Sequence, residues 1–224
     1  MCLCRESAPL WTLLLLLSNL LLWDNVASVT MCAMKNGHCF LSLKKMFHMA
    51  GKQSREASEI ISGIFTDFKK HYVEVHRLQK TVPNKCHTSS IPLPKNKEQA
   101  WKAGKNDLLK SVDILLTSWN TPLQHLEDLF TLKDVPAVVI SKVKTMKEKD
   151  AGLVEGIKTL YNLLGNGETV NYPAWTGKAS LKSDNEDARI LAFYDMISCL
   201  NSDFKKIKIY LNILKWKIYR LKNY

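Results

Sequence analysis

The 224-residue sequence has no apolar run long enough to cross a membrane as a helix. Its longest apolar run, residues 10–23, covers about 14 residues, whereas a membrane-spanning helix needs about 20. We therefore expect no membrane insertion. Nine Gly, seven Pro and 46% hydrophobic residues are ordinary for a globular domain, so collagen-like, low-complexity and disordered classes are excluded.

Motifs of catalysis and metal binding are also missing. The sequence has no nucleophile elbow, phosphate-binding loop or zinc-hydrolase motif, so we expect no enzyme, no catalytic residue and no cofactor. None of its six histidines lies four residues from another, so no helical metal site is predicted. Beyond residue 28 there is no Asn-X-Ser/Thr acceptor, which excludes a mechanism that depends on an N-linked glycan.

The apolar run near the N-terminus predicts a secretory signal peptide over residues 1–28. Arg5 places a weak positive charge before the run, and the Val-Ala-Ser sequence at 26–28 offers small residues for cleavage. The alternative is an N-terminal anchor helix, which is disfavoured because Asp24 ends the run early. We expect residues 29–224 to be a single secreted, extracellular domain.

Four cysteines remain after the predicted cleavage: Cys32, Cys39, Cys86 and Cys199. An even number of cysteines in a secreted protein indicates two disulfides, and four cysteines allow three pairings. Cys32 and Cys39 are seven residues apart, which favours a small local loop. A second bond between Cys86 and Cys199 would stabilise the fold by roughly 4–5 kcal/mol in the chain-entropy model.

The sequence carries a net charge of +11, which is compatible with nucleic acid, anionic membrane, sulfated glycan or an acidic protein as partner. The expected secretion argues against nucleic acid. Lysines gather toward the C-terminus, where Lys205, Lys208, Lys215 and Lys222 follow one stripe beside an apolar seam. This stripe is a candidate heparan sulfate surface, because sulfates need several closely spaced cations. The alternative is an ordinary solvated face.

Four segments have the hydrophobic spacing of amphipathic helices, and strand signals are few. The helices are expected at about 42–79, 97–130, 136–164 and 184–220. The last is the most regular, with apolar residues spaced by three and four over four heptads: Ile190, Phe193, Ile197, Leu200, Phe204, Ile207, Leu211, Leu214, Ile218 and Leu221. Its apolar seam is typical of a helical bundle.

Three local signals concern the ends and the course of these helices. Ser183, followed by Glu186 three residues later, predicts a capping box at the start of the last helix. Pro136 suits the first position of the third helix. Pro122 predicts a kink in the second, because proline removes a backbone donor and clashes with the preceding turn.

The lengths of the connections predict the topology. The first and third connections are long, at about 17 and 19 residues, whereas the middle one has about five. Short connections join antiparallel neighbours, and long ones let a helix return parallel to its predecessor. The predicted fold is all-α, an up-up-down-down long-chain four-helix bundle of the cytokine type with two long crossover loops.

Six segments together resemble the prolactin and growth hormone family, above all the rodent placental prolactin-like proteins and proliferins. They are residues 31–40, Cys-His-Thr-Ser-Ser at 86–90, Lys-Glu-Gln-Ala at 97–100, Ser-Trp-Asn-Thr-Pro-Leu at 118–123, Asn-Tyr-Pro-Ala-Trp at 171–175 and Asp-Asn-Glu-Asp-Ala-Arg at 184–189. The resemblance covers residues 31–215 and implies the disulfides Cys32–Cys39 and Cys86–Cys199.

The resemblance implies a hormone that acts by binding. In the family, one bundle engages one class I cytokine receptor through its first and last helices and the first crossover. It can engage a second receptor through its first and third helices. The expected partner is therefore the ectodomain of the prolactin receptor or a relative. The expected outcome is receptor dimerisation and JAK–STAT signalling, with a placental origin and a role in pregnancy.

Five positions match receptor-contact residues of the family. Phe65, Tyr194, Lys206 and Tyr210 correspond to contacts with the first receptor, and Gly156 to the glycine that keeps a cleft open for the second. The alternative for the tyrosines is packing at the flank of the bundle. For Gly156 it is an incidental helix glycine.

Four positions depart from the family. Prolactins carry histidines at the positions of Arg55 and Ser58, and histidine and aspartate at those of Lys205 and Lys208. Those family residues help to form a zinc- and pH-sensitive receptor contact. The cations found here would be repelled by a receptor surface that is complementary to prolactin. The alternative function is a non-lactogenic secreted factor that binds heparan sulfate or a different receptor through its basic last helix.

Overall fold

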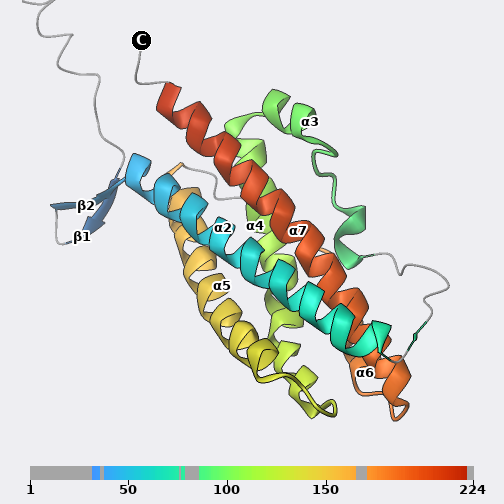
Figure 1. The fold of residues 1–224 in the computed structure, drawn as a ribbon. Coiled ribbons are helices and arrows are strands. Elements are labelled where there is room, and N and C mark those ends of the chain that lie inside the picture. Colours follow the sequence, from blue (N-terminus) through green and yellow to red (C-terminus); the bar gives the residue numbers. More distant parts are fainter. Residues whose placement is uncertain (1–31, 36–37, 76, 79–85, 165–170, 221–224) are drawn as a thin grey trace, which may run out of the picture.

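The computed structural model describes residues 32–220 except 36–37, 76, 79–85 and 165–170, and it describes no side chain before residue 41. Four long helices form a bundle (Figure 1): α2 (Leu43–Phe68), α4 (Lys105–Gln124), α5 (Ala137–Leu163) and α7 (Glu186–Arg220). Their apolar stripes face one another and bury one continuous core, with Trp119, Phe47 and Phe204 among its largest fully buried side chains. The predicted signal peptide lies outside the described residues.

Contacts along the helices fix their directions. Helix α2 is antiparallel to α7 and to α5, and α4 is antiparallel to α7. The pairs that establish this are Phe65 with Tyr194 and Lys44 with Tyr219, Asp67 with Lys142 and Gln53 with Gly152, and Trp119 of α4 with Asp203 together with Trp101, which precedes α4, with Trp216. The arrangement is the up-up-down-down bundle that the connection lengths predicted.

The first helix changes its winding near its end. Helix α2 stops at Phe68, and the chain continues as a π-helix, η1, over Lys69–Glu74. The Tyr72 hydroxyl donates to the carbonyl of Lys133 at 2.8 Å, which ties this turn to the segment before α5. The regular helix is therefore shorter than the expected span of 42–79, part of which lies outside the described residues.

The continuous helix expected over 97–130 is wrong, because the segment is divided into α3 (Lys97–Lys102), α4 and the 3-10 helix η3 (Leu126–Thr131). The break between α3 and α4 is held by Lys217, whose ammonium donates to the carbonyls of Trp101 and Ala103 at 2.8 and 2.6 Å. Carbonyls at a helix end have no partner within the helix, and a lysine from another helix can satisfy them.

Pro122 lies inside α4, in its last turn, and the helix stops at Gln124 and is followed by η3. The expected kink at Pro122 stays a prediction. The third helix begins directly after Pro136, whose carbonyl accepts from the N–H groups of Val139 and Ile140.

The capping box expected from Ser183 and Glu186 is also wrong. The side chain of Asn185 caps α7, since its Oδ1 accepts from the backbone N–H of Ala188 at 3.0 Å. Ser183 supports this cap by accepting from the N–H of Asn185 at 3.3 Å. A short helix, α6 (Lys178–Leu181), precedes this start in the second crossover.

Two short strands precede the bundle. β1 (Cys32–Lys35) and β2 (His38–Ser42) pair antiparallel as a hairpin that leads directly into α2. The cysteine side chains of this hairpin lie outside the described part, so the Cys32–Cys39 disulfide stays a prediction. Among the helices that the structure describes, none is long and apolar enough to span a membrane.

Candidate functional site

Helix α7 carries two stripes of side chains with different neighbours. The first stripe borders α2: Tyr194, Asn201, Lys215 and Tyr219 contact Phe65, Ser62, His48 and Lys44 respectively. The second stripe lies beneath the described part of the first crossover, residues 86–96, and consists of Cys199, Asp203, Lys206 and Tyr210. Between the two stripes α7 exposes Ser202 and Lys205. This strip of α7, with its flanking stripes, is the candidate site.

A disulfide fixes the start of the crossover on α7. Cys86 and Cys199 are bonded, and their Cα atoms lie 5.6 Å apart. The bond spans 113 residues of sequence, so it removes much of the freedom of the unfolded chain. It is the pairing that the family resemblance implied.

Asp203 collects three donors from three different elements. Its Oδ2 accepts from the Thr88 hydroxyl at 2.6 Å and from the Trp119 indole Nε1 at 2.9 Å. Its Oδ1 accepts from the Lys206 ammonium at 2.7 Å. The Asp203 side chain is only 1% exposed, so these bonds replace the water that a buried carboxylate loses. Asp203 thereby joins the crossover, α4 and α7.

His87 makes a second tie between the crossover and α4. Its Nε2 donates to the carbonyl oxygen of Ser118 at 3.1 Å, and its ring meets the edge of Trp119 at 4.7 Å between centroids. Burial lowers the pKa of His87, although the Ser118 carbonyl and the Asp203 carboxylate oppose this shift. The histidine therefore favours the neutral form, with its proton on Nε2.

Tyr210, a predicted receptor contact, is buried beneath the crossover. Its side chain is 2% exposed, and its hydroxyl donates to the carbonyl of Pro94 at 2.8 Å. Burial, together with the negative charge of Asp203, raises the pKa of Tyr210 to about 12. Tyr210 thus holds the crossover in place and offers no surface of its own, which matches the alternative of bundle packing.

Phe65, Tyr194 and Lys206 do reach the surface. The rings of Phe65 and Tyr194 lie 5.5 Å apart with a 33° tilt, and both residues are partly exposed. The Lys206 side chain is 39% exposed while its ammonium is held by Asp203. The structure therefore places the aromatic pair on one flank of the α7 strip and a fixed cation on the other.

Gly156 lies on α5 with open space around it. A Cβ at this position would meet no atom within 4 Å, apart from its own helix backbone and chain neighbours. At Gly152, one turn earlier, a Cβ would stand 3.3 Å from the Gln53 amide of α2. The surface of α5 thus opens from Gly152 to Gly156.

The basic stripe of α7 is only partly solvated. Lys205 is exposed, Lys208 and Lys215 are partly buried, and Lys222 lies outside the described residues. The ammonium of Lys215 lies 3.2 Å from Nδ1 of His48 on α2. Two positions that depart from the family also differ in exposure, because Arg55 is exposed whereas Ser58 is 1% exposed.

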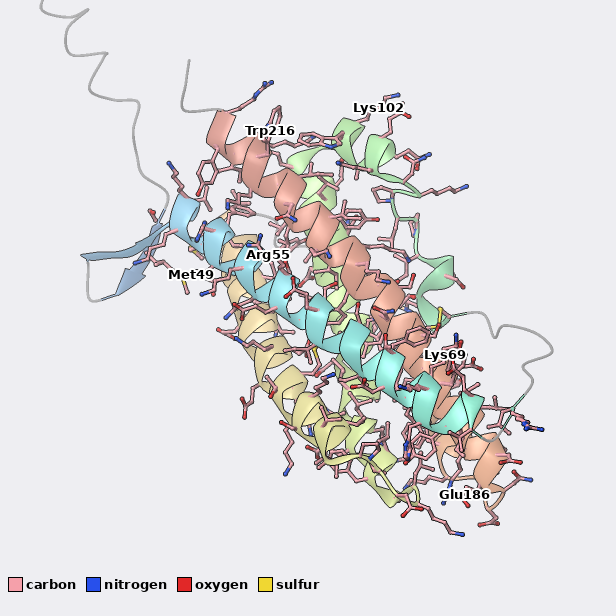
Figure 2. All side chains as sticks on the ribbon, in the orientation of Figure 1. Met49, Arg55, Lys69, Lys102, Glu186 and Trp216 are labelled. Atoms are coloured by element: carbon pink, nitrogen blue, oxygen red, sulfur yellow. A yellow bond between two sulfur atoms is a disulfide. The ribbon has the colours of Figure 1, made fainter. Side chains whose placement is uncertain are left out.

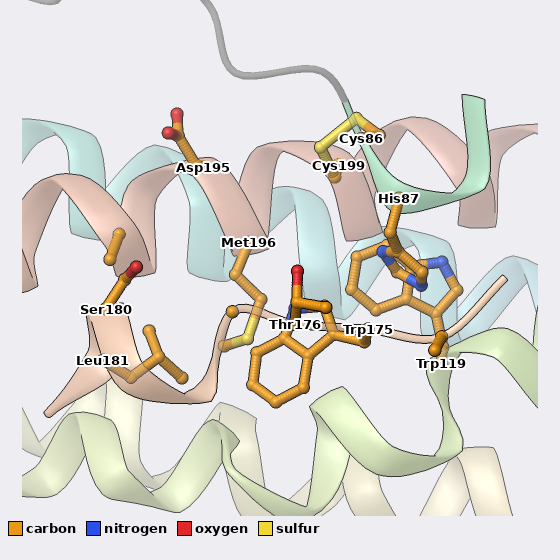
Figure 3. Close-up of a pocket in the computed structure, with 13 residues that line it drawn as sticks. Cys86, His87, Trp119, Trp175, Thr176, Ser180, Leu181, Asp195, Met196 and Cys199 are labelled. Atoms are coloured by element: carbon orange, nitrogen blue, oxygen red, sulfur yellow. A yellow bond between two sulfur atoms is a disulfide. The ribbon is translucent and has the colours of Figure 1, made fainter. Parts of the chain in front are cut away.

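A cavity of about 380 Å³ lies where the two crossovers meet α7 (Figure 3). Its lining mixes aromatic and apolar side chains, such as Trp175 and Met196, with polar ones, such as Ser180 and Asp195, and the disulfide stands at one side. Within the described ranges no group of three or more His, Cys, Asp or Glu side chains is placed to hold a metal ion.

Sequence reasoning missed the buried residues that position the site. Asp203 is one of them, and it stands one residue before the apolar seam position Phe204. One signal was available: Asp203 follows Cys199 by four residues, so the two side chains lie on one face of the helix. The cysteine that fixes the crossover therefore also marks the carboxylate that binds it.

Comparisons with known proteins agree with this geometry. The model of the somatotropin hormone family matches residues 15–222. Mouse Prolactin-2C5 and Prolactin-2C2 are 46% and 47% identical over 215 and 217 residues, covering 95% of each chain. Rat Prolactin-2A1 is 42% identical over 212 residues, covering 93% of each chain.

The chain belongs to the somatotropin and prolactin hormone family. The members of this family are secreted signalling hormones that bind cytokine receptors, and they are not enzymes. This agrees with the absence of catalytic motifs in the sequence. A hormone presents contact surfaces instead of a reaction centre, and the strip of α7 between α2 and the crossover is the candidate for such a surface.

Proposed function

We propose that the chain is a secreted hormone that binds the ectodomain of a class I cytokine receptor, the prolactin receptor or a relative. It signals by bringing two receptors together and so activating the JAK–STAT pathway, in pregnancy. The observation that carries this proposal is the surface of α7 between the Phe65–Tyr194 pair and Lys206, which the docked crossover completes.

This surface is ordered before any receptor arrives. The disulfide, the bonds of Asp203 and the bond between Tyr210 and Pro94 hold the crossover against α7. Lys206 keeps its geometry through Asp203, so little side-chain entropy remains to be lost on binding. Partly exposed aromatic residues at the centre of an interface commonly supply most of its binding energy. Phe65 and Tyr194 are the candidates for that role.

A second surface lies on α5 around Gly156. The open space there accommodates a receptor segment close to the helix backbone, which any side chain at this position would obstruct. Met49 is 43% exposed and lies on the neighbouring α2, one turn from Gln53. Gln53 stands beside Gly152, and Gly156 lies one turn from Gly152 toward the same end of the bundle as Met49. An exposed apolar side chain beside an open backbone suits a second receptor contact.

The test is to express the full sequence in secreting mammalian cells and to purify the chain from the medium. Binding to the immobilised prolactin-receptor ectodomain is then measured with and without zinc. We expect binding at nanomolar concentration that zinc does not enhance, because cations occupy the positions of Lys205 and Lys208. An absence of binding at micromolar chain, with both helicity and the disulfides verified, would contradict a prolactin-receptor ligand.

Gly156→Arg separates the two surfaces. It should leave one receptor bound per hormone but abolish the complex with two receptors and the signal in responsive cells. Ala151→Arg is the matched control, since Ala151 is also exposed on α5. If both variants lose the two-receptor complex equally, Gly156 does not mark a second receptor-binding surface.

A second candidate function is binding of heparan sulfate through the basic stripe Lys205, Lys208, Lys215 and Lys222. Its supporting observation is that the sequence holds no Asp or Glu after Asp203, so the exposed Lys205 has no acidic neighbour later in α7. Retention on heparin at salt concentrations well above those that elute the chain from a plain cation exchanger would support it. Elution at the same salt from both resins would reject it.

A further inference from the structure

Two long stretches of the sequence contain no acidic residue. Residues 25–55 and residues 204–224 hold no Asp or Glu but many Lys and Arg. The antiparallel packing of α2 on α7 brings the described parts of these stretches side by side, as the contacts of His48 with Lys215 and of Lys44 with Tyr219 show. One end of the bundle is therefore built from two acid-free helix segments.

Aromatic rings hold the cations at this end. The Lys44 and Lys215 ammonium groups lie 4.5 and 5.7 Å from the centroid of the Tyr219 ring. The Arg220 guanidinium lies 4.0 Å from the centroid of Trp216. Such cation–π contacts orient a cation without neutralising it. These contacts hold three positive charges, on three turns of two helices, in place before any ligand binds.

Trp216 is at the centre of this end and is 42% exposed. Its ring meets Trp101 of α3 edge-on, at 4.6 Å between centroids. Figure 2 shows Trp216 close to Lys102 of α3, at the end of the bundle opposite Lys69 and Glu186. A partly exposed indole that is braced from behind offers a flat, rigid platform.

Three cations at this end have no carboxylate partner within the described ranges, although Lys102 of α3 pairs with Glu98. Among the residues that the structure describes, Lys44, Lys215 and Arg220 pair with no Asp or Glu side chain. On the side of α2 that faces α5, by contrast, lysines do have acidic partners: Lys142 pairs with Asp67 and Lys149 with Glu56. Cations that lack a carboxylate partner attract an external anion.

We propose that Lys44, Lys215, Arg220 and Trp216 form the main contact for a sulfated glycan of the heparan sulfate class. This inference rests on the second candidate function and relocates its centre. The proposed contact extends from the basic stripe on α7 to Lys44 of α2, and it adds the ring of Trp216. The glycan's sulfates bind the three cations while one sugar ring contacts the exposed part of Trp216, whose ring is covered on one side by Arg220.

The shape of the basic surface favours a linear polyanion. With the exposed Lys205, which lies outside the main contact, the cations of α7 extend over a helix rise of about 22 Å to Arg220, at 1.5 Å per residue. A single phosphate or a small anion cannot reach both ends, whereas a polymer with an anionic group on each unit can. Lys217 is excluded from the contact, because its ammonium is bound to the carbonyls of Trp101 and Ala103.

The test measures the affinity of the purified full-length secreted chain for a heparin oligosaccharide over a range of salt concentrations. The end variant Lys44→Gln/Lys215→Gln/Arg220→Gln is compared with a control variant of equal charge, Lys70→Gln/Lys178→Gln/Lys182→Gln. The three control lysines are exposed and lie on η1, α6 and the turn after α6. Circular dichroism and thermal midpoints verify that both variants fold.

We expect the end variant to bind about 10–100-fold more weakly and the control less than about threefold more weakly. The slope of log K against log salt should fall by about 2–3 in the end variant, since each lost cation releases one fewer counter-ion. Trp216→Ala should weaken binding several-fold with an unchanged slope, because it removes a platform and no charge.

The outcomes separate this inference from the function on which it rests. Equal losses in the end and control variants would mean that bulk charge alone binds the glycan, which overturns the inference. If only Lys205→Gln/Lys208→Gln weakens heparin binding, the basic stripe binds the glycan and the proposed end site does not. Heparin retention no stronger than on a plain cation exchanger would overturn both. Binding of phosphatidylserine vesicles, unaffected by heparin, would assign the surface to a membrane instead.

Discussion

The ring Nε2 of His87 lies 3.1 Å from the carbonyl oxygen of Ser118, the acceptor that Pro122 leaves without a helical donor. In a regular helix the N–H of residue 122 would donate to the carbonyl of residue 118, but proline has no N–H. The histidine of the crossover supplies the missing hydrogen bond. Docking of the crossover on α4 therefore replaces the hydrogen bond that Pro122 removes from the helix.

This relationship predicts that His87 and Pro122 are energetically coupled. His87→Leu should cost about 1–3 kcal/mol of unfolding free energy, because it leaves the buried Ser118 carbonyl without a donor. In a Pro122→Ala background the restored N–H of residue 122 takes that role, so the same change should cost at least about 1 kcal/mol less. Urea denaturation of the four proteins measures the coupling, and equal costs in both backgrounds would contradict it.

Asp203 should be the most sensitive polar residue of the crossover. Asp203→Ala leaves the Thr88 hydroxyl and the Trp119 indole without an acceptor, so we expect a loss of about 3–5 kcal/mol. Thr88→Val should cost about 1 kcal/mol, since it removes one bond. The control is Asp187→Ala at an exposed position of α7. A loss for Asp203→Ala no larger than that of the control, with the disulfide intact, would refute the role of Asp203.

Asp150 gives the fold a predictable pH dependence. It is 8% exposed on α5, its Oδ1 finds no hydrogen-bond partner among the described residues, and burial raises its pKa to about 7. The unfolded chain loses this proton near the ordinary value of 3.8, so the folded state binds more protons between about pH 4 and 7. Stability contributed by this group is therefore present at low pH and is lost as pH rises through about 7.

Asp150→Asn removes this titration. Relative to the unmodified chain, its unfolding free energy should improve by roughly 2–3 kcal/mol between pH 5 and pH 8. Asp184→Asn, at an exposed position before α7, is the control and should show no such trend. Denaturation curves of all three proteins at the two pH values give the answer, and a constant difference across pH would exclude Asp150 as the source.

Gly156→Ala should stabilise the hormone while leaving its shape unchanged. The new Cβ meets nothing within 4 Å, and alanine favours a helix over glycine by about 0.5–1 kcal/mol. Gly63→Ala is the comparison, because its Cβ would stand 2.9 Å from the Lys142 ammonium that pairs with Asp67. Thermal melts should rank Gly156→Ala above Gly63→Ala, and the reverse ranking would show that α5 is packed at Gly156.

The sequence predicted the parts of this structure that depend on local periodicity. The spacing of apolar residues predicted all four long helices, and the two long connections predicted their directions. Phe65, Tyr194 and Lys206 are partly exposed, and their role as receptor contacts stays a prediction. These features follow from residues a few positions apart or from motifs.

The errors concern interactions between distant residues. Lys217 satisfies the end of α3 from 114 residues away, and the local sign of that break is Gly104, because glycine commonly follows a helix end. Tyr210 matches a family contact by position, yet the carbonyl of Pro94 and the depth of the crossover bury it. Asn185 and Ser183 both suit a helix start, and only the path of the second crossover decides between them.

The central claim is that Phe65 and Tyr194 bind the receptor from the α2 flank of the α7 strip, opposite the docked crossover. The most direct measurement compares Phe65→Ala/Tyr194→Ala with Tyr172→Ala in titrations of the immobilised prolactin-receptor ectodomain. Tyr172 is 50% exposed in the second crossover, so it controls for the loss of an exposed aromatic ring. We predict at least a tenfold weaker affinity for the double variant and an unchanged affinity for Tyr172→Ala. Equal affinities for the two variants, with helicity retained, would contradict the account.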